Sequence, residues 1–224
     1  MLPIVWQSDS LIAINKPSGL PSQAAAGIES VETRIRLQLN LDAGYLALPH
    51  RLDRSVSGLL LVALTKKTAR LISQQFESRM IVKSYLAIVR GHAKVEPLIW
   101  IDRLKKVKDE ARAEISDQDD PDGRRCETRV ESLGVDAGIG QSVLRLHPHT
   151  GRMHQLRVQA SARGIPILGD TLYGGDPWPG EHDRIALHAE KLEFRHPKTG
   201  IQTQVRCLPD WLNEFGLDDP AISM

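Results

Sequence analysis

A charged segment runs directly into an apolar stretch in the first third of this 224-residue chain. The segment reads His50-Arg51-Leu52-Asp53-Arg54-Ser55-Val56-Ser57-Gly58, and the apolar stretch is Leu59-Leu60-Leu61-Val62-Ala63-Leu64. A stretch of that length is typical of a buried strand, because a membrane-spanning helix needs roughly 20 apolar residues. The sequence therefore predicts a carboxylate, that of Asp53, at the mouth of a buried strand.

The neighbours of Asp53 suit a chemical role for its carboxylate. His50, Arg51 and Arg54 all lie within three positions of it. Nearby positive charge favours the charged form of a carboxylate, and a charged carboxylate can act as a nucleophile. Charged loop tetrapeptides are nevertheless more typical of solvated surface, so a function has to be argued from further segments.

Composition narrows the class of protein. Lys and Arg number 29 against 28 Asp and Glu, so the formal net charge of +1 argues neither for nor against a nucleic-acid partner. Cys126 and Cys207 are the two cysteines, and no secretory pattern opens the chain, which predicts the reducing cytoplasm. Without repeats or linkers, residues 1–224 are expected to form a single catalytic domain.

Apolar periodicity and turn residues predict a chain of mixed α/β class. Strands are expected at 4–6, 11–14, 59–64, 81–89, 143–146, 192–194 and 203–205, with exposed hairpins over 98–130. Helices are expected over 29–39 after the cap Ser30, after the cap Thr65, over 152–163 and near Trp211. Lys83 and Tyr85, two residues apart in one strand, are expected on the same face.

A second segment is rich in hydrogen-bond donors. It reads Thr150-Gly151-Arg152-Met153-His154-Gln155-Leu156-Arg157, a turn that leads into a predicted helix start. Helix N-termini bind anions through their N–H groups, and arginine matches phosphate and carboxylate geometry. In the helix expected from Arg152 to Arg163, Met153, Leu156 and Ala160 would form the buried stripe, while His154 and Arg157 share another face.

Taken together, these segments resemble the RluA family of RNA pseudouridine synthases. The matching pieces are His50-Arg51-Leu52-Asp53 with Ser57-Gly58 and Lys66, Lys83-Ser84-Tyr85, Gly151 to Arg157, Ile165 to Gly174, Leu187-His188-Ala189 and His196-Pro197. The similarity extends from the turn at Asn15-Lys16-Pro17-Ser18-Gly19 to about Pro209, in the family's order. Several specific motifs in order are strong support for the resemblance.

The resemblance implies the pseudouridine synthase fold. This is a mixed, mainly antiparallel sheet flanked by helices, with a central RNA-binding cleft and two subdomains sharing one sheet. Larger members also carry an N-terminal RNA-binding domain of the S4 type, which this chain is expected to lack. Substrate selection would then come from the catalytic domain itself.

The resemblance also implies the chemistry. Asp53 is expected to be the catalytic carboxylate that acts on a uridine turned out of its RNA helix. It would either attack ribose C1′ or take the proton from C2′, and the sequence leaves both routes open. Neither route needs a metal or a cofactor. His147, His149 and His154 fit no common zinc spacing, so no metal site is expected.

Other site residues are carried over from the family in the same way. Arg157 matches the basic partner of the aspartate, Tyr85 the tyrosine that packs on the target base, and Arg51 the arginine that fills the vacated space. His50, Arg152 and His154 are expected to help bind the RNA. The expected partner is ribosomal RNA, transfer RNA or both, and the protein is expected to be a monomer without membrane contact.

One position departs from the family pattern. Val56 stands where the family usually has threonine before Ser-Gly, so a hydroxyl is lost while the branched shape is kept. A non-catalytic RNA-binding or ribosome-assembly factor on the same fold is therefore a rival interpretation. A hydrolase of a glycosidic bond is another, although it would need a second carboxylate that no motif supplies.

Two further features admit two interpretations each. Lys105, Lys106 and Lys108 would contact RNA phosphates or simply form a solvated face. Trp178, in Asp176-Pro177-Trp178-Pro179-Gly180, would be an RNA-stacking loop tip or a locally packed anchor. The Ser57-Gly58 pair lacks the preceding glycine of a hydrolase nucleophile motif, so Ser57 is not expected to be a nucleophile.

Overall fold

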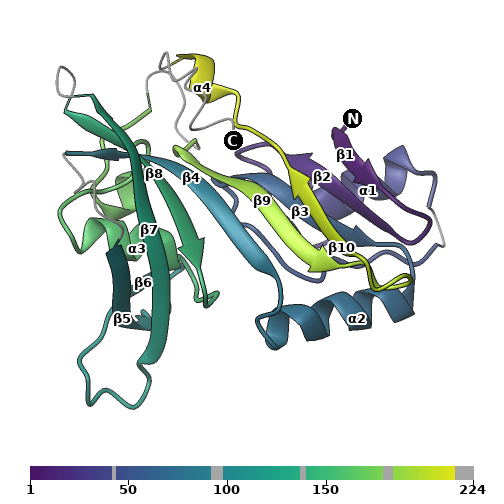
Figure 1. The fold of residues 1–224 in the computed structure, drawn as a ribbon, viewed down its shortest axis with the longest axis horizontal. Helices are drawn as coiled ribbons and strands as arrows, with labels where there is room; N and C mark the ends of the chain where they lie inside the picture. The colour runs from purple at the N-terminus through teal and green to yellow at the C-terminus, as the bar shows by residue number, and fades with distance from the viewer. Residues whose placement is uncertain (42–43, 92–97, 137–139, 179–183, 215–224) are drawn as a thin grey trace. The chain divides into compact units, whose positions relative to one another are not determined.

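The structure is a computed structural model that describes residues 1–41, 44–91, 98–136, 140–178 and 184–214. The chain forms two compact units (Figure 1). Unit 1 comprises residues 1–83 and 188–210, and unit 2 comprises residues 84–187 with the C-terminal residues from Trp211. None of the helices within the described ranges has the length and apolar character that crossing a membrane requires.

In the part of unit 1 that the structure describes, five strands form a sheet with two helices. The strands are β1 (Ile4–Gln7), β2 (Leu11–Lys16), β3 (Ser57–Ala63), β9 (Leu187–Arg195) and β10 (Gln202–Arg206), and the helices are α1 (Val31–Gln38) and α2 (Lys66–Glu77). β2 pairs antiparallel with β1 and β3, and β10 pairs antiparallel with β9. β3 meets β9 in a short parallel pairing at Ser57–His188 and Gly58–Ala189.

The apolar stretch after Asp53 forms a central strand of this sheet, as predicted. Residues Leu59 to Ala63 of β3 are fully buried, so both faces of the strand are covered. Leu59 and Leu61 point toward a core that includes Ile72 of α2 and Phe194 of β9. Burial on both faces explains why the stretch shows no alternation of apolar and polar residues.

Caps place the two helices where the sequence predicts them. The Ser30 hydroxyl accepts a hydrogen bond from Thr33 N at 3.3 Å, and the Thr33 hydroxyl in turn accepts from Ser30 N at 2.9 Å. Thr65 accepts from Thr68 N at 3.2 Å and starts α2. Each cap satisfies an N–H that the first helical turn leaves without an intrahelical partner.

Unit 2 contains an antiparallel sheet in the order β4-β8-β7-β5-β6. Its elements are β4 (Val82–Arg90), β5 (Leu98–Lys106), β6 (Ala113–Ile115), β7 (Arg124–Asp136), β8 (Gln141–Pro148), α3 (Gln155–Ser161), the 3-10 turn η1 (Thr171–Tyr173) and α4 (Trp211–Glu214). The exposed hairpins expected over 98–130 are instead long strands with a buried side. Trp100, Leu104, Cys126 and Val130 are all buried on them.

The helix expected from Arg152 begins later than predicted. α3 starts at Gln155, and His154 before it adopts a left-handed conformation with φ of 52°. Met153 and His154 therefore lie outside the helix. Of the expected buried stripe, Leu156 and Ala160 are buried as predicted, whereas Met153 precedes the helix and is half-buried. Gln155 through Ala160 are all buried, because α3 packs against β5 and β6 on one side and η1 on another. Sequence periodicity cannot show a short helix that is covered all round.

The units together confirm the predicted mixed α/β class, with mainly antiparallel strands and one parallel pair in unit 1. Gly58 is required at that parallel pair. Its φ is +111°, and a Cβ there would lie 2.4 Å from Ala189 O and 2.5 Å from Ala189 N. Backbone, rather than a movable side chain, fills the space.

Replacing Gly58 with alanine should therefore separate β3 from β9 locally. We expect Gly58→Ala to destabilise the protein by at least about 2 kcal/mol, through positive-φ strain and the clash with Ala189. Urea unfolding would measure the loss. Gly134→Ala is the matched control, because a Cβ at Gly134 meets nothing within 4 Å. Equal stability of the two variants would contradict the expectation.

Candidate active site

The segment around Asp53 forms a tight turn at the start of β3. Val56 N donates to Asp53 O at 3.1 Å, which closes the turn over residues 53–56. Asp53 itself is half-buried, and its neighbours Arg51 and Arg54 are exposed. The turn places the Asp53 side chain at the strand's entrance, as the sequence predicts.

A second turn, over residues 16–20, holds the first one in place. Gly19 N donates to Arg54 O at 2.9 Å, and Arg54 Nε donates back to Gly19 O at 2.9 Å. The Ser18 hydroxyl donates to Ser55 O at 2.7 Å. The turn that carries Asp53 is thus tied by its backbone oxygens to a segment more than thirty residues away.

Lys16 lies buried beneath both turns. Its ammonium donates to Leu20 O at 2.7 Å, Pro17 O at 2.9 Å and Arg54 O at 3.1 Å. Its three N–H groups therefore all have carbonyl partners. Burial lowers the pKa of Lys16 to about 7, and the Asp53 carboxylate opposes that shift. A negative charge at Asp53 thus stabilises the buried cation that orders its turn.

His50 has a role within unit 1. Its Nε2 accepts from Leu61 N at 2.9 Å, and its ring lies against Phe76 with centroids 4.5 Å apart. Burial and then the charge of Lys83 lower the pKa of His50 to about 3, so the ring is neutral at pH 7. His50 therefore fastens the segment before Asp53 to β3. Its expected contact with RNA stays a prediction.

Ser57 and His188 join β3 to β9 where the strands run parallel. His188 Nε2 lies 3.0 Å from Cys207 O, an atom that can only accept, so Nε2 carries a proton. Burial lowers the pKa of His188 to about 4, and the neutral ring then accepts from the Ser57 hydroxyl at Nδ1, at 2.8 Å. The Ser57 hydroxyl thus links β3 to β9 beside their parallel pairing.

Val56 is 3% exposed and packs inside the turn. The bonds that order the turn come from Lys16, Ser18, Gly19 and the backbone of Val56 itself. None of them uses the Val56 side chain. The lost hydroxyl that made this position the main departure from the family is therefore not what holds the turn.

In unit 2, Arg157 is held by a buried acidic partner. Its Nε and Nη2 donate to the two carboxylate oxygens of Asp170 at 2.7 and 2.8 Å, and both side chains are almost fully buried. The guanidinium also lies 5.1 Å from the centre of the Tyr173 ring. A bidentate pair of this kind fixes the plane of the guanidinium. Sequence reasoning missed Asp170, although it lies in the matched segment Ile165 to Gly174.

His154 and Tyr85 are also placed by unit 2. His154 Nδ1 lies 2.8 Å from the Tyr173 hydroxyl, which accepts from Ala113 N at 2.9 Å. The left-handed backbone of His154 is the kind of uncommon conformation that clusters at functional sites. Tyr85 lies half-buried on β4, in register with Leu146 of β8.

Comparisons with known proteins now bear on this geometry. Residues 10–162 match the family model described as RNA pseudouridylate synthase. A dual-specificity RNA pseudouridine synthase RluA of Yersinia pestis is 34% identical over 208 residues, covering 91% of this chain and 97% of that protein. A tRNA pseudouridine synthase C of Haemophilus ducreyi is 37% identical, covering 96% of each chain.

The chain belongs to the RNA pseudouridine synthase family. Among solved structures, human RNA pseudouridylate synthase domain containing 1 matches with a TM-score of 0.77 and 30% identity, covering 95% of this chain and 84% of that one. The resemblance to the RluA family and the predicted fold are thereby confirmed. The protein is an RNA pseudouridine synthase, an isomerase.

The expected site residues of this synthase divide between its units. His50, Arg51 and Asp53 belong to unit 1, whereas Tyr85, Arg152, His154 and Arg157 belong to unit 2. Within unit 1, Lys16 and β3 hold the turn of Asp53 and the ring of His50, whereas in unit 2 β4 carries Tyr85 and η1 contacts His154 and Arg157. The roles assigned to these residues by resemblance stay predictions.

The structure shows the contacts of Lys105 and Trp178, the residues for which the sequence allows two interpretations each. Lys105 Nζ pairs with Asp120 at 2.8 Å and with Glu114 at 3.6 Å, and these contacts raise the pKa of Lys105. Its charge is therefore largely compensated within unit 2. Trp178 is buried, and the guanidinium carbon of Arg184 lies 4.3 Å from the centre of its ring. This packing favours a locally packed anchor over an RNA-stacking loop tip. Among described residues, no three His, Cys, Asp or Glu side chains gather as a metal site.

His50, which is half-buried, and His188, which is buried, predict how the synthase responds to acid. The pKa values of His50 and His188 are lowered to about 3 and about 4 in the folded state, against 6.5 for an ordinary histidine. Between pH 6.5 and 4 the unfolded chain binds more protons, so stability is full above pH 6.5 and falls as the pH falls. We expect each of these two histidines to lower the free energy of unfolding by about 2 kcal/mol at about pH 5, relative to its value at about pH 7.5.

His188→Gln tests this directly. A glutamine can keep an acceptor toward Ser57 and a donor toward Cys207 O without titrating. Urea unfolding of both proteins at about pH 7.5 and about pH 5 should show a smaller acid loss in the variant by about 2 kcal/mol. An acid loss as large as that of the wild type would show that the pKa of His188 does not differ between the folded and unfolded states.

Proposed function

We propose that this synthase converts specific uridines to pseudouridine in structured ribosomal RNA, transfer RNA or both, with Asp53 as its catalytic carboxylate. One observation carries the assignment. Asp53 is the carboxylate of the motif that resembles the family's catalytic segment, and it sits on a turn ordered by Lys16 and the 16–20 turn. The relatives' names, which include a tRNA pseudouridine synthase and a ribosomal large subunit pseudouridine synthase, support these two RNA classes.

The reaction is an isomerisation that needs a held anion. The bond from ribose C1′ to uracil N1 breaks, the uracil turns, and C1′ bonds to C5. The proton leaves C5 and N1 gains one, so atoms balance without a cofactor. Asp53 begins the reaction by attacking C1′ or by taking the proton from C2′. Either route uses the carboxylate as an anion.

The other site residues assigned from the family resemblance would offset the free energy of turning the base out of its stack. Unstacking a base costs a few kcal/mol, which aromatic and arginine contacts can offset. We propose that Tyr85 packs on the uracil, that Arg51 fills the vacated stack and that Arg157 is the basic partner of Asp53. His50, Arg152 and His154 would assist RNA binding, with His50 acting through the position of its segment. The RNA cleft, the cytoplasmic location and the monomeric state also remain proposals.

Asp53→Asn should abolish pseudouridine formation. We expect turnover to fall by at least ~1,000-fold, because an amide neither attacks C1′ nor removes a proton. The assay is tritium release from RNA labelled at uracil C5, using total tRNA and ribosomal RNA from cells that lack the gene.

Asp9→Asn is the matched control, since Asp9 is an exposed aspartate of the same unit that pairs at the surface with Lys198. It should keep wild-type turnover. Turnover by Asp53→Asn at the wild-type rate would refute the assignment of Asp53. Release of free uracil by the wild type would identify a glycosidic hydrolase instead.

Val56→Thr tests whether the family's hydroxyl matters in this chain. Because the turn is held by other groups, we expect turnover to change by less than about tenfold, the effect of about one hydrogen bond. Thermal unfolding and the tritium assay together would check it. A gain beyond a hundredfold would show that the hydroxyl orders the catalytic turn and that the native chain is a weak catalyst.

A further inference from the structure

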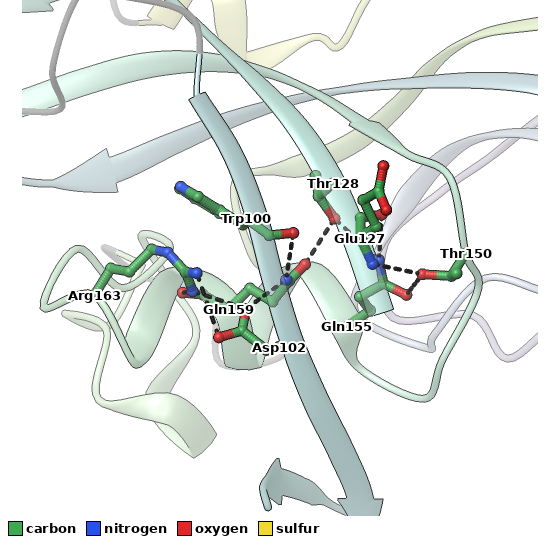
Figure 2. Close-up of polar contacts among 8 residues, drawn as sticks. All are labelled: Trp100, Asp102, Glu127, Thr128, Thr150, Gln155, Gln159 and Arg163. Atoms are coloured by element: carbon green, nitrogen blue, oxygen red, sulfur yellow. Dashed lines mark hydrogen bonds and ion pairs between the residues drawn. The ribbon is translucent and has the colours of Figure 1, made fainter. Parts of the chain in front are cut away.

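A continuous row of polar side chains, buried except at its half-buried end Asp102, attaches α3 to the sheet of unit 2 (Figure 2). The row begins at Thr150 in the turn before α3 and passes through Gln155, Thr128 and Gln159 to Asp102 on β5. Thr128 and Gln159 are completely buried, and Gln155 is 4% exposed. Helices usually bury apolar residues against a sheet, so this polar contact calls for a reason of its own.

Every polar atom of the two glutamine amides has a partner. Gln155 Oε1 accepts from the Thr150 hydroxyl at 2.7 Å and from Arg152 N at 3.0 Å. Gln155 Nε2 donates to Glu127 O at 3.1 Å and to the Thr128 hydroxyl at 2.9 Å. Gln159 Oε1 accepts from the Thr128 hydroxyl at 2.6 Å, and Gln159 Nε2 donates to Asp102 at 2.6 Å and to Trp100 O at 3.4 Å.

The row can point in one direction only. At one end, the backbone N–H of Arg152 can only donate, so it fixes the oxygen of Gln155 toward itself. At the other end, the carboxylate of Asp102 can only accept, and it also pairs with Arg163 at 3.0 Å. Thr128 between them accepts from one glutamine and donates to the other. No amide can flip without placing two donors or two acceptors against each other.

This row determines the rotation of α3 about its axis. Gln155 and Gln159 are four residues apart and therefore share one face of the helix. Arg157, two residues from each, lies about 200° away at about 100° per residue, on the opposite side. There it forms the bidentate pair with Asp170. The glutamine face thus sets where the guanidinium on the opposite face points.

We infer that Gln155 and Gln159 are positioning residues for the pseudouridine synthase reaction, which act by fixing the rotation of α3 and hence the guanidinium of Arg157. The inference rests on the proposed role of Arg157. An apolar helix face of the same shape would pack against the sheet equally well. It would allow α3 to slide and rotate, however, because van der Waals contacts have no direction. Directional hydrogen bonds specify one arrangement.

Gln159→Met removes the row at its centre while keeping a side chain of similar length. We expect kcat to fall by roughly 10- to 100-fold, as displacements of a reacting group do, with the KM for RNA changed less than about threefold. Gln74→Met, at an exposed glutamine of α2, is the matched control and should leave both constants unchanged. Tritium release from RNA labelled at uracil C5 measures kcat and KM in each protein.

A charge exchange separates positioning from general damage to the fold. Gln159→Glu places a carboxylate against Asp102 and should lower kcat further than Gln159→Met. Adding Asp102→Asn restores a donor opposite the introduced carboxylate, while the asparagine oxygen can still accept from Arg163. We therefore expect the double variant to recover at least about tenfold of the kcat lost by Gln159→Glu.

The outcomes distinguish this inference from the proposed function. Arg157→Lys and Asp53→Asn are measured alongside. Wild-type turnover in both would overturn the proposed roles of those residues, and with them the inference. If those variants lose turnover while Gln159→Met keeps the wild-type kcat, only the positioning inference is overturned. A double variant that stays as slow as Gln159→Glu, whether through misfolding or poor chemistry, overturns it as well.

Discussion

The buried ammonium of Lys16 is the interaction on which the conformation of the Asp53 segment depends. It supplies three donors to carbonyls from two turns, one of which carries Asp53. Without that cation, those carbonyls would lose buried partners, at a cost of about 1–3 kcal/mol for each one left unsatisfied. The cation is itself costly to bury, which is why the pKa of Lys16 falls to about 7. The Asp53 carboxylate offsets part of that cost.

The two units order their reactive residues by a common physical means. In unit 1 a lysine, a histidine and two turns fix the Asp53 segment, and in unit 2 two glutamines and an aspartate fix α3. These groups are buried and polar, and their hydrogen bonds are satisfied within their own unit. Such networks add less to stability than apolar packing does, but they specify a single geometry. The proposed roles of Asp53 and Arg157 require a defined geometry more than they require additional stability.

Local patterns were sufficient for the parts of the fold that depend on near neighbours. The caps Ser30 and Thr65 and the buried strand after Asp53 follow from residues within a few positions of each other. The start of α3 could not be predicted in this way. Arg152 N donates to the side chain of Gln155, and His154 adopts a left-handed conformation before the helix begins. The partners Lys16, His188 and Asp170 are separated from the residues they hold by 13 to 131 positions, and no local pattern encodes such pairings.

A signal for Lys16 is nevertheless present in the sequence. In β2 it follows Ile12 and Ile14 at a spacing of two, so it falls on the same buried face as they do. A lysine in phase with core residues, just before a Pro-Ser-Gly turn, indicates a buried cation that needs carbonyl acceptors. The rings of His50 and His188 are neutral at pH 7, whereas the ammonium of Lys16 donates to Arg54 O within the turn that carries Asp53. The pKa of Lys16 lies near neutrality, and this couples the order of the turn to the charge that Asp53 carries.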